Sequence, residues 1–138
     1  KYAENSDFTL QTDFSSNSTV FQADVLVTDW SGIAYEYSFT TLKPTLFINT
    51  PMKVMNPDYK ELGIEPFDII IRDKVGISVE LDALQSIAET VHALLNDNEY
   101  SPEEMAKIRE QYLYNIGKSG NVGAKYIIAR LIEYSKKN

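Results

Sequence analysis

The sequence predicts an α/β fold, a Rossmann-like parallel sheet with flanking helices that ends in a helical tail. Residues 24–28 and 45–48 are nearly continuous in apolar residues, which is typical of strands covered on both faces in a parallel sheet. Between them, residues 31–41 carry apolar side chains at helical spacing. The three segments have the length of a β-α-β unit with one crossover helix.

Two further strands and one loop are predicted around this unit. Residues 8–12 and 67–71 are short runs of β-prone, largely apolar residues, and both are predicted as strands. Pro44 stands where the strand after the crossover helix begins, a position at which proline costs no ladder hydrogen bond. Residues 51–66 hold three prolines and a glycine and are predicted to form a long ordered loop.

Beyond residue 80 the apolar pattern changes to the helical period. The second helix of this part begins at Ser101-Pro102, a capping serine followed by a first-turn proline, and is predicted to end near Gly117. One domain is predicted over residues 1–138, with an α/β part over about 1–97 and a helical tail over about 101–136. The first helix has the apolar stripe Leu81, Leu84, Ile87, Ala88, Val91 and Leu95, and the last has the predicted buried face Ala124, Ile127, Ile128, Leu131 and Ile132.

Composition excludes several classes of protein. The 138 residues include 20 acidic and 13 basic side chains, so the net charge of −7 disfavours nucleic-acid binding. The chain has no cysteine and one histidine, so it lacks the usual ligands of a zinc site, and neither a metal nor a cofactor is expected. No apolar run reaches the roughly 18 to 20 residues of a membrane span. Because residue 1 is Lys and not Met, we expect a piece of a longer protein.

The strand over residues 24–28 runs directly into a segment with the chemistry of an anion site. In an open parallel sheet, ligands bind at the carboxyl ends of strands, where new helices present unpaired amides. Gly32 allows close approach of a phosphate, and Ser31 offers a hydroxyl to the same oxygens. Glu36, one helical turn further, suits a ribose diol. The alternative is that Asp29 and Ser31 only cap the helix and Glu36 is a solvated charge.

The same segment resembles a known family. Residues 23–33, Ala-Asp-Val-Leu-Val-Thr-Asp-Trp-Ser-Gly-Ile, followed by Lys-Pro-Thr-Leu-Phe at 43–47, resemble the core motif of the CDP-glycerol glycerophosphotransferases of teichoic acid synthesis. The resemblance continues more loosely to the C-terminus, including the Gly-Lys-Ser-Gly turn at 117–120. It implies the C-terminal, donor-binding half of a GT-B fold. In that pattern the donor-binding positions are Thr28, Asp29, Trp30, Ser31, Gly32 and Glu36.

The match to that family has three departures. Trp30 replaces the usual tyrosine, Gly32 replaces a second serine, and residues 50–66 do not match the family's tyrosine-rich loop. The UDP-N-acetylglucosamine 2-epimerases have a sister pattern, Thr-Asp-x-Gly-Gly-Ile-x-x-Glu followed by Lys-Pro. Gly32, Ile33 and Glu36 fit that pattern well, whereas Trp30 and Ser31 fit the glycerophosphotransferases better.

Other residues that bear on chemistry have simpler explanations. His92 lies on a distal helix and is expected to be structural or exposed. Asp13, Asp24 and Asp29 would suit magnesium if they met at one sheet edge, as in receiver domains, but each also starts or ends a local element. The tyrosines on the last two helices are expected to pack in the core rather than to stack on a ligand. These are Tyr112, Tyr126 and Tyr134.

The resemblance implies a transferase that moves glycerol phosphate from CDP-glycerol to a polyol-phosphate polymer. The acceptor would bind an N-terminal domain outside this chain, and the catalytic histidines are expected upstream, so this chain alone should be incomplete. The full protein is expected in the cytoplasm, peripheral to the inner face of the bacterial membrane. The alternatives are a UDP-sugar epimerase or glycosyltransferase of the GT-B fold, and a non-catalytic nucleotide-binding or receiver-like module. The acceptor polymer and the choice of glycerol or ribitol are left open.

Overall fold

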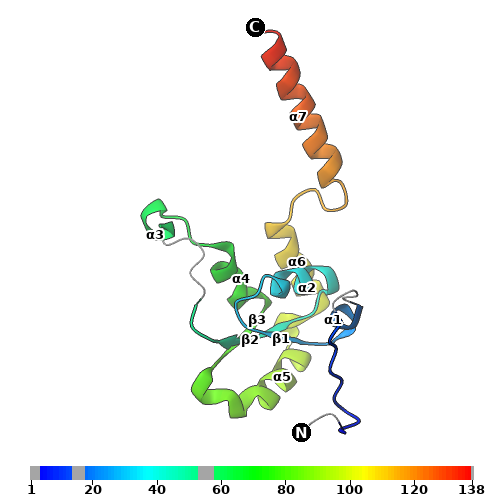
Figure 1. The fold of residues 1–138 in the computed structure, drawn as a ribbon, viewed down its shortest axis with the longest axis vertical. Coiled ribbons are helices and arrows are strands. Elements are labelled where there is room, and N and C mark those ends of the chain that lie inside the picture. Colours follow the sequence, from blue (N-terminus) through cyan, green and yellow to red (C-terminus); the bar gives the residue numbers. More distant parts are fainter. Residues whose placement is uncertain (1–3, 14–17, 53–57, 138) are drawn as a thin grey trace.

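Three parallel strands form the sheet, in the order β1 (Leu26–Thr28), β2 (Thr45–Asn49) and β3 (Gly76–Glu80) (Figure 1). The computed structural model describes residues 4–13, 18–52 and 58–137. Thr28 lies opposite Phe47, which in turn lies opposite Ser78. The predicted α/β class, a Rossmann-like parallel sheet flanked by helices, is confirmed.

Helices cover both faces of this sheet. On one face lie α2 (Ile33–Thr41), α4 (Phe67–Val75) and α6 (Pro102–Tyr112) (Figure 1). On the other lie the short 3-10 helix η1 (Leu81–Ser86) and α5 (Ile87–Asn96). Because side chains alternate across a strand, neighbouring residues of β2 pack into different layers. The core on the α2 side contains Ala34, Phe39, Phe47, Ile71, Val75 and Met105, and the core on the α5 side contains Leu46, Val79 and Leu94.

The two predicted core strands differ in burial. The first three residues of β2 are buried, as a strand covered on both faces requires. In β1, by contrast, Val27 is 48% exposed, so the prediction that this strand is covered on both faces is wrong. Val27 lies opposite Leu46, on the α5 side of the sheet, and α5 packs against β2 and β3. The edge strand β1 therefore lacks a full cover on that side.

The predicted strand over residues 67–71 is a helix. This segment begins α4, in which Phe67, Ile71 and Val75 recur every four residues and pack against the sheet. Pro66 precedes the first turn, a position where its missing N–H leaves no helical bond unmade. The third strand is β3, which begins directly after α4 and was not predicted.

Gly76 opens β3 at a position where no other residue fits. An added Cβ would lie 1.6 Å from the carbonyl oxygen of Thr45 on the neighbouring strand. The glycine therefore allows β3 to pair closely with β2 immediately after α4 ends.

The N-terminal part and the predicted loop also differ from expectation. Residues 8–12 form no strand, and Leu10 is 73% exposed, so these apolar residues have no layer to join. A short helix, α1 (Ser18–Gln22), follows. Within the predicted loop over residues 51–66 lies another short helix, α3 (Tyr59–Leu62), while residues 53–57 of that loop fall outside the described residues.

The helices after the sheet follow the predicted order with different ends. The helix expected from residue 81 starts as η1, bends at Ala83 and continues as α5. A single 3-10 turn, η2 (Asn98–Tyr100), leads into α6. The cap of α6 is confirmed, since the Glu104 N–H donates to the Ser101 hydroxyl at 3.4 Å. This helix ends at Tyr112 and not near Gly117, and the N–H of Leu113 donates to the carbonyl of Arg109 at 2.8 Å.

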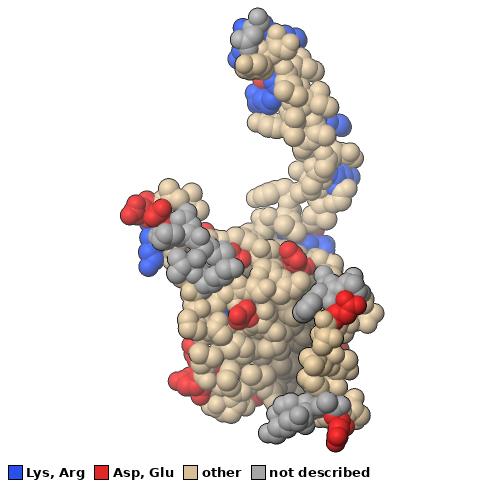
Figure 2. All heavy atoms as spheres, in the orientation of Figure 1, with Lys and Arg blue, Asp and Glu red and all other residues tan. Residues whose placement is uncertain are grey.

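The last helix, α7 (Ser119–Ser135), projects away from the sheet and its covering helices (Figure 1). Its predicted buried face is exposed, with Leu131 at 63%, because no element of the described chain packs against it. Basic side chains gather along α7, whereas acidic ones are spread over the body (Figure 2). Across the described residues, no helix combines the length and the apolar content that crossing a membrane requires.

Candidate functional site

The ends of all three strands meet at one edge of the sheet. Trp30 follows β1, Asn49 ends β2 and Glu80 ends β3. Because the strands are parallel, this is the carboxyl edge, where ligands of open α/β sheets bind. The segment that was predicted to bind phosphate, at the turn from β1 into α2, lies at this edge.

Helix α2 begins without a side-chain cap. Its N-cap residue is Gly32, and no side-chain oxygen accepts a hydrogen bond from the first turn. The amide of Ala34 bonds to the carbonyl of Ser31 at 3.2 Å. The alternative that Asp29 and Ser31 cap this helix is therefore wrong. The start of α2 keeps the positive end of the helix dipole and amides without a side-chain partner, which is the chemistry of an anion site.

Gly32 has ordinary helical backbone angles, with φ −61° and ψ −18°, so its conformation does not require glycine. The absence of a side chain leaves room for Tyr35, because an added Cβ would lie 3.0 Å from the Tyr35 hydroxyl. Burial, and then the nearby Asp68 and Glu36, raise the pKa of Tyr35. This phenol therefore stays a protonated donor beside the helix start, and the sequence analysis did not identify it.

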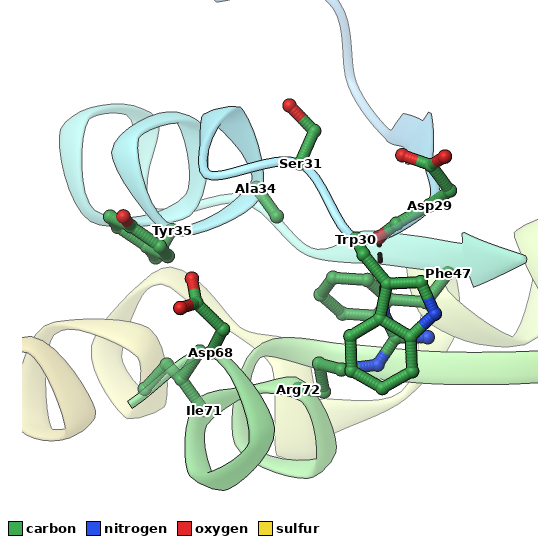
Figure 3. Close-up of a pocket in the computed structure, with 9 residues that line it drawn as sticks. All are labelled: Asp29, Trp30, Ser31, Ala34, Tyr35, Phe47, Asp68, Ile71 and Arg72. Atoms are coloured by element: carbon green, nitrogen blue, oxygen red, sulfur yellow. Dashed lines mark hydrogen bonds between the residues drawn. The ribbon is translucent and has the colours of Figure 1, made fainter. Parts of the chain in front are cut away.

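The six predicted residues occupy the edge in different ways. Figure 3 shows the hydroxyl of Ser31 and the carboxylate of Asp29 pointing to the same open side, away from the packed residues beneath them. Thr28 ends β1 and is half-buried, while Glu36 is exposed in the first turn of α2. The Asp29 carboxylate has the wrong sign for phosphate. Ser31 and the amides of α2 are thus the groups suited to bind an anion.

Trp30 and an arginine that the sequence analysis missed form a stack beneath this surface. The guanidinium of Arg72 lies 3.9 Å from the ring centre of Trp30 and 4.3 Å from that of Phe47 (Figure 3). The Trp30 indole donates to the carbonyl of Thr50 at 2.8 Å. Trp30 therefore joins the loops that follow β1 and β2, a structural role in addition to any contact with ligand.

Arg72 also begins a chain of hydrogen bonds across the three strand ends. It donates to the carbonyl of Asp29 at 2.9 Å and to the side-chain oxygen of Asn49 at 2.6 Å. The amide nitrogen of Asn49 then donates to Glu80 at 2.5 Å. Burial lowers the pKa of Arg72, and the acids Asp73, Asp29 and Glu80 oppose that shift. With only 5% of the residue exposed, Arg72 is an internal clamp.

Two hollows adjoin the clamp. The smaller, below Ser31 and beside Asp68, measures about 10 Å³ and has room for about one water molecule (Figure 3). The larger is an open groove of about 470 Å³ between the ends of β2 and β3, bounded by Trp30 and Glu80. The smaller hollow is too small for any ligand beyond a water molecule, so the outer surface of α2 and the larger groove are the places at this edge with room for one.

The Lys-Pro element of the predicted motif lies at the other edge of the sheet. Lys43 pairs with Asp24 at 2.9 Å and donates to the carbonyl of Ala23 at the same distance. It thus fixes the start of β1 beside the start of β2. Asp24 and Asp29 lie at opposite ends of β1, so they cannot share the magnesium ion of a receiver domain. Across the described segments, no group of acids and histidines has the geometry of a metal site.

The remaining candidates lie away from this edge. His92 is exposed on α5, as expected, on the far side of the sheet from α2. Tyr112 packs against Phe67 with ring centres 5.5 Å apart. Tyr126 and Tyr134 are 61% and 70% exposed on α7, so their predicted core role is wrong because α7 does not join the core.

Comparison with known proteins returned no match from protein-family models, curated proteins or solved structures.

Proposed function

We propose that this chain is the donor-binding domain of a CDP-glycerol type glycerophosphotransferase, with the diphosphate of the donor bound at the start of α2. The resemblance of residues 23–33 and 43–47 to that family's core motif supports the choice of donor. The single observation that carries the proposal is the uncapped start of α2 at the carboxyl edge of a parallel sheet.

In the complete enzyme, a hydroxyl of the acceptor polymer attacks the β-phosphorus of CDP-glycerol. A new phosphorus–oxygen bond forms, the bond between the β-phosphorus and the bridging oxygen breaks, and CMP leaves with that oxygen. The hydroxyl proton passes to a base that is expected upstream of this chain. The groups here, the α2 amides and the hydroxyl of Ser31, hold the diphosphate in line and stabilise its charge.

The ribose is assigned to Glu36. Its carboxylate is exposed one turn beyond Gly32, on the helix that would hold the diphosphate. An acidic side chain next to a diphosphate site is the usual partner of a ribose diol. The same exposure and the spacing from Gly32 also suit a UDP-sugar enzyme of the GT-B fold, which is the second candidate function.

Calorimetric titration with CDP, UDP and inorganic diphosphate tests the proposal. We expect wild type to bind CDP more tightly than UDP, and the reverse order would favour the UDP-sugar candidate. Glu36→Ala should weaken CDP binding about tenfold, the scale of a charge-assisted hydrogen bond, and leave inorganic diphosphate almost unchanged. Equal weakening of both ligands would contradict the assignment of Glu36 to the ribose.

Two variants separate phosphate binding from a structural role of the helix start. Ser31→Ala should weaken CDP binding about fivefold with little change in stability, because the Ser31 hydroxyl does not cap α2. Gly32→Val is compatible with the helical angles at that position, and its Cβ would lie 3.0 Å from the Tyr35 hydroxyl; the side chain would block the phosphate. Thr40→Ala, an exposed change further along α2, is the control. A folded Gly32→Val protein that keeps wild-type CDP affinity would overturn the proposal.

A further inference from the structure

The open groove of about 470 Å³ at the ends of β2 and β3 is not used by the diphosphate or by the ribose as assigned above. It is bounded by Trp30 on the β1 side and by Glu80 on the β3 side, with Asn49 and Ser78 between them. The lining of the groove thus combines these polar residues with the apolar side chains of Trp30, Met52 and Ile69.

The charges along the groove make it a poor site for a second anion. Asp73 and Glu80 are exposed carboxylates on its walls. Among the described residues that line it, the one cation is Arg72, which lies against the rings of Trp30 and Phe47 and already donates to Asp29 and Asn49. A phosphate here would meet two like charges and a guanidinium that is already engaged.

The hydrogen-bonding groups suit a neutral, hydroxyl-rich ligand instead. Carboxylates accept hydrogen bonds from diols, and Glu80 is exposed while its position is fixed by the Asn49 amide. Ser78 adds a half-buried hydroxyl on the same wall. Because Asn49 is itself held by Arg72, the orientation of this wall is set by the internal clamp.

The proposed orientation of the bound donor also places its polyol in this groove. If the diphosphate lies at Ser31 and Gly32 and the ribose lies towards Glu36, the group on the other phosphate must extend the opposite way. That way passes Trp30, which both precedes α2 and lines the groove. We propose, on the basis of the function proposed above, that the groove binds the polyol of the donor and that Glu80 determines its specificity by accepting hydrogen bonds from polyol hydroxyls.

The experiment compares CDP-glycerol with CDP by calorimetry, in wild type and in Glu80→Ala. A second readout is the fluorescence of Trp30, the one tryptophan of the chain, which lines the groove. Asp82→Ala is the matched control, because it removes the same charge from an exposed residue just beyond β3 and outside the groove lining. We expect Glu80→Ala to weaken CDP-glycerol binding about tenfold and CDP binding less than twofold. Asp82→Ala should change neither affinity.

The outcomes separate this inference from the proposed function. If wild type binds CDP but Glu80→Ala leaves CDP-glycerol affinity unchanged, or weakens both ligands equally, the polyol assignment is overturned and the nucleotide site stands. If Trp30 fluorescence is the same with CDP-glycerol bound as with CDP bound, the polyol lies outside the groove. If wild type binds neither ligand, the proposed function fails and this assignment fails with it.

Discussion

Replacing Arg72 by methionine should lower the free energy of unfolding by about 3–5 kcal/mol. The variant loses the contacts of the guanidinium with the rings of Trp30 and Phe47, together about 1–2 kcal/mol for a desolvated site. It also leaves the carbonyl of Asp29 and the side-chain oxygen of Asn49 without their donor, at roughly 1–1.5 kcal/mol each. Methionine fills similar space, so a cavity adds little to the loss.

Urea denaturation followed by far-ultraviolet circular dichroism measures this change. Arg130→Met is the matched control, since Arg130 also lies near an aromatic ring, Tyr126, but is exposed on α7. We expect the control to change stability by less than about 0.5 kcal/mol, as exposed ion pairs contribute little. A loss below about 1 kcal/mol for Arg72→Met would refute the description of Arg72 as an internal clamp.

Two further predictions concern the body and the last helix. Burial raises the pKa of Tyr37 to about 12, and its hydroxyl donates to the carbonyl of Ala23, so this stabilisation is complete below pH 10 and is lost as the pH rises towards 12. Tyr37→Phe should lower the free energy of unfolding by about 0.5–1.5 kcal/mol at pH 8. At pH 11 the difference between wild type and variant should be smaller, and a difference that does not change with pH would contradict this prediction. Deleting residues 118–138 should leave the thermal midpoint within about 2 °C in calorimetry, because α7 contributes nothing to the core clusters, and a drop beyond about 5 °C would show that it does.

The parts of the fold that could be predicted from the sequence are formed by residues close together in the chain. The β-α-β unit was predictable because β2 lies in the middle of the sheet and is apolar on both faces, and because an apolar helix of crossover length precedes it. The turn at residues 28–33 then followed from the position of the strand end. These features depend on neighbours in the chain, so a local pattern is enough to reveal them.

The prediction failed at α4 because short apolar runs are ambiguous. Residues 67–71 contain three isoleucines in a row, which favours a strand, and the helical spacing is visible only when Val75 is included. That error hid β3, and with it the groove and Glu80. It also hid Arg72, which reaches Asp29 over 43 positions of the chain, a distance that no local pattern can bridge.

At α7 the sequence pattern correctly predicted a helix, but the prediction that its apolar face is buried was wrong. The apolar residues do lie at helical spacing, and α7 is a helix over nearly the predicted range. Amphipathic spacing indicates which face of a helix avoids water, but it does not identify a partner for that face. In this chain the described body offers none, so Ile127 and Leu131 stay exposed.

The most direct test of the nucleotide site is a map of amide chemical shifts in the isotope-labelled chain during titration with CDP. We expect the largest changes at Ser31, Gly32 and Ile33, with smaller ones at Tyr35 and Glu36. The hollow beside Leu42, Lys43 and Asp97, of about 280 Å³, should show none, because it lies at the opposite end of the strands. Changes centred on that hollow, or none at the start of α2 under saturating CDP, would contradict a nucleotide site at the turn from β1 into α2.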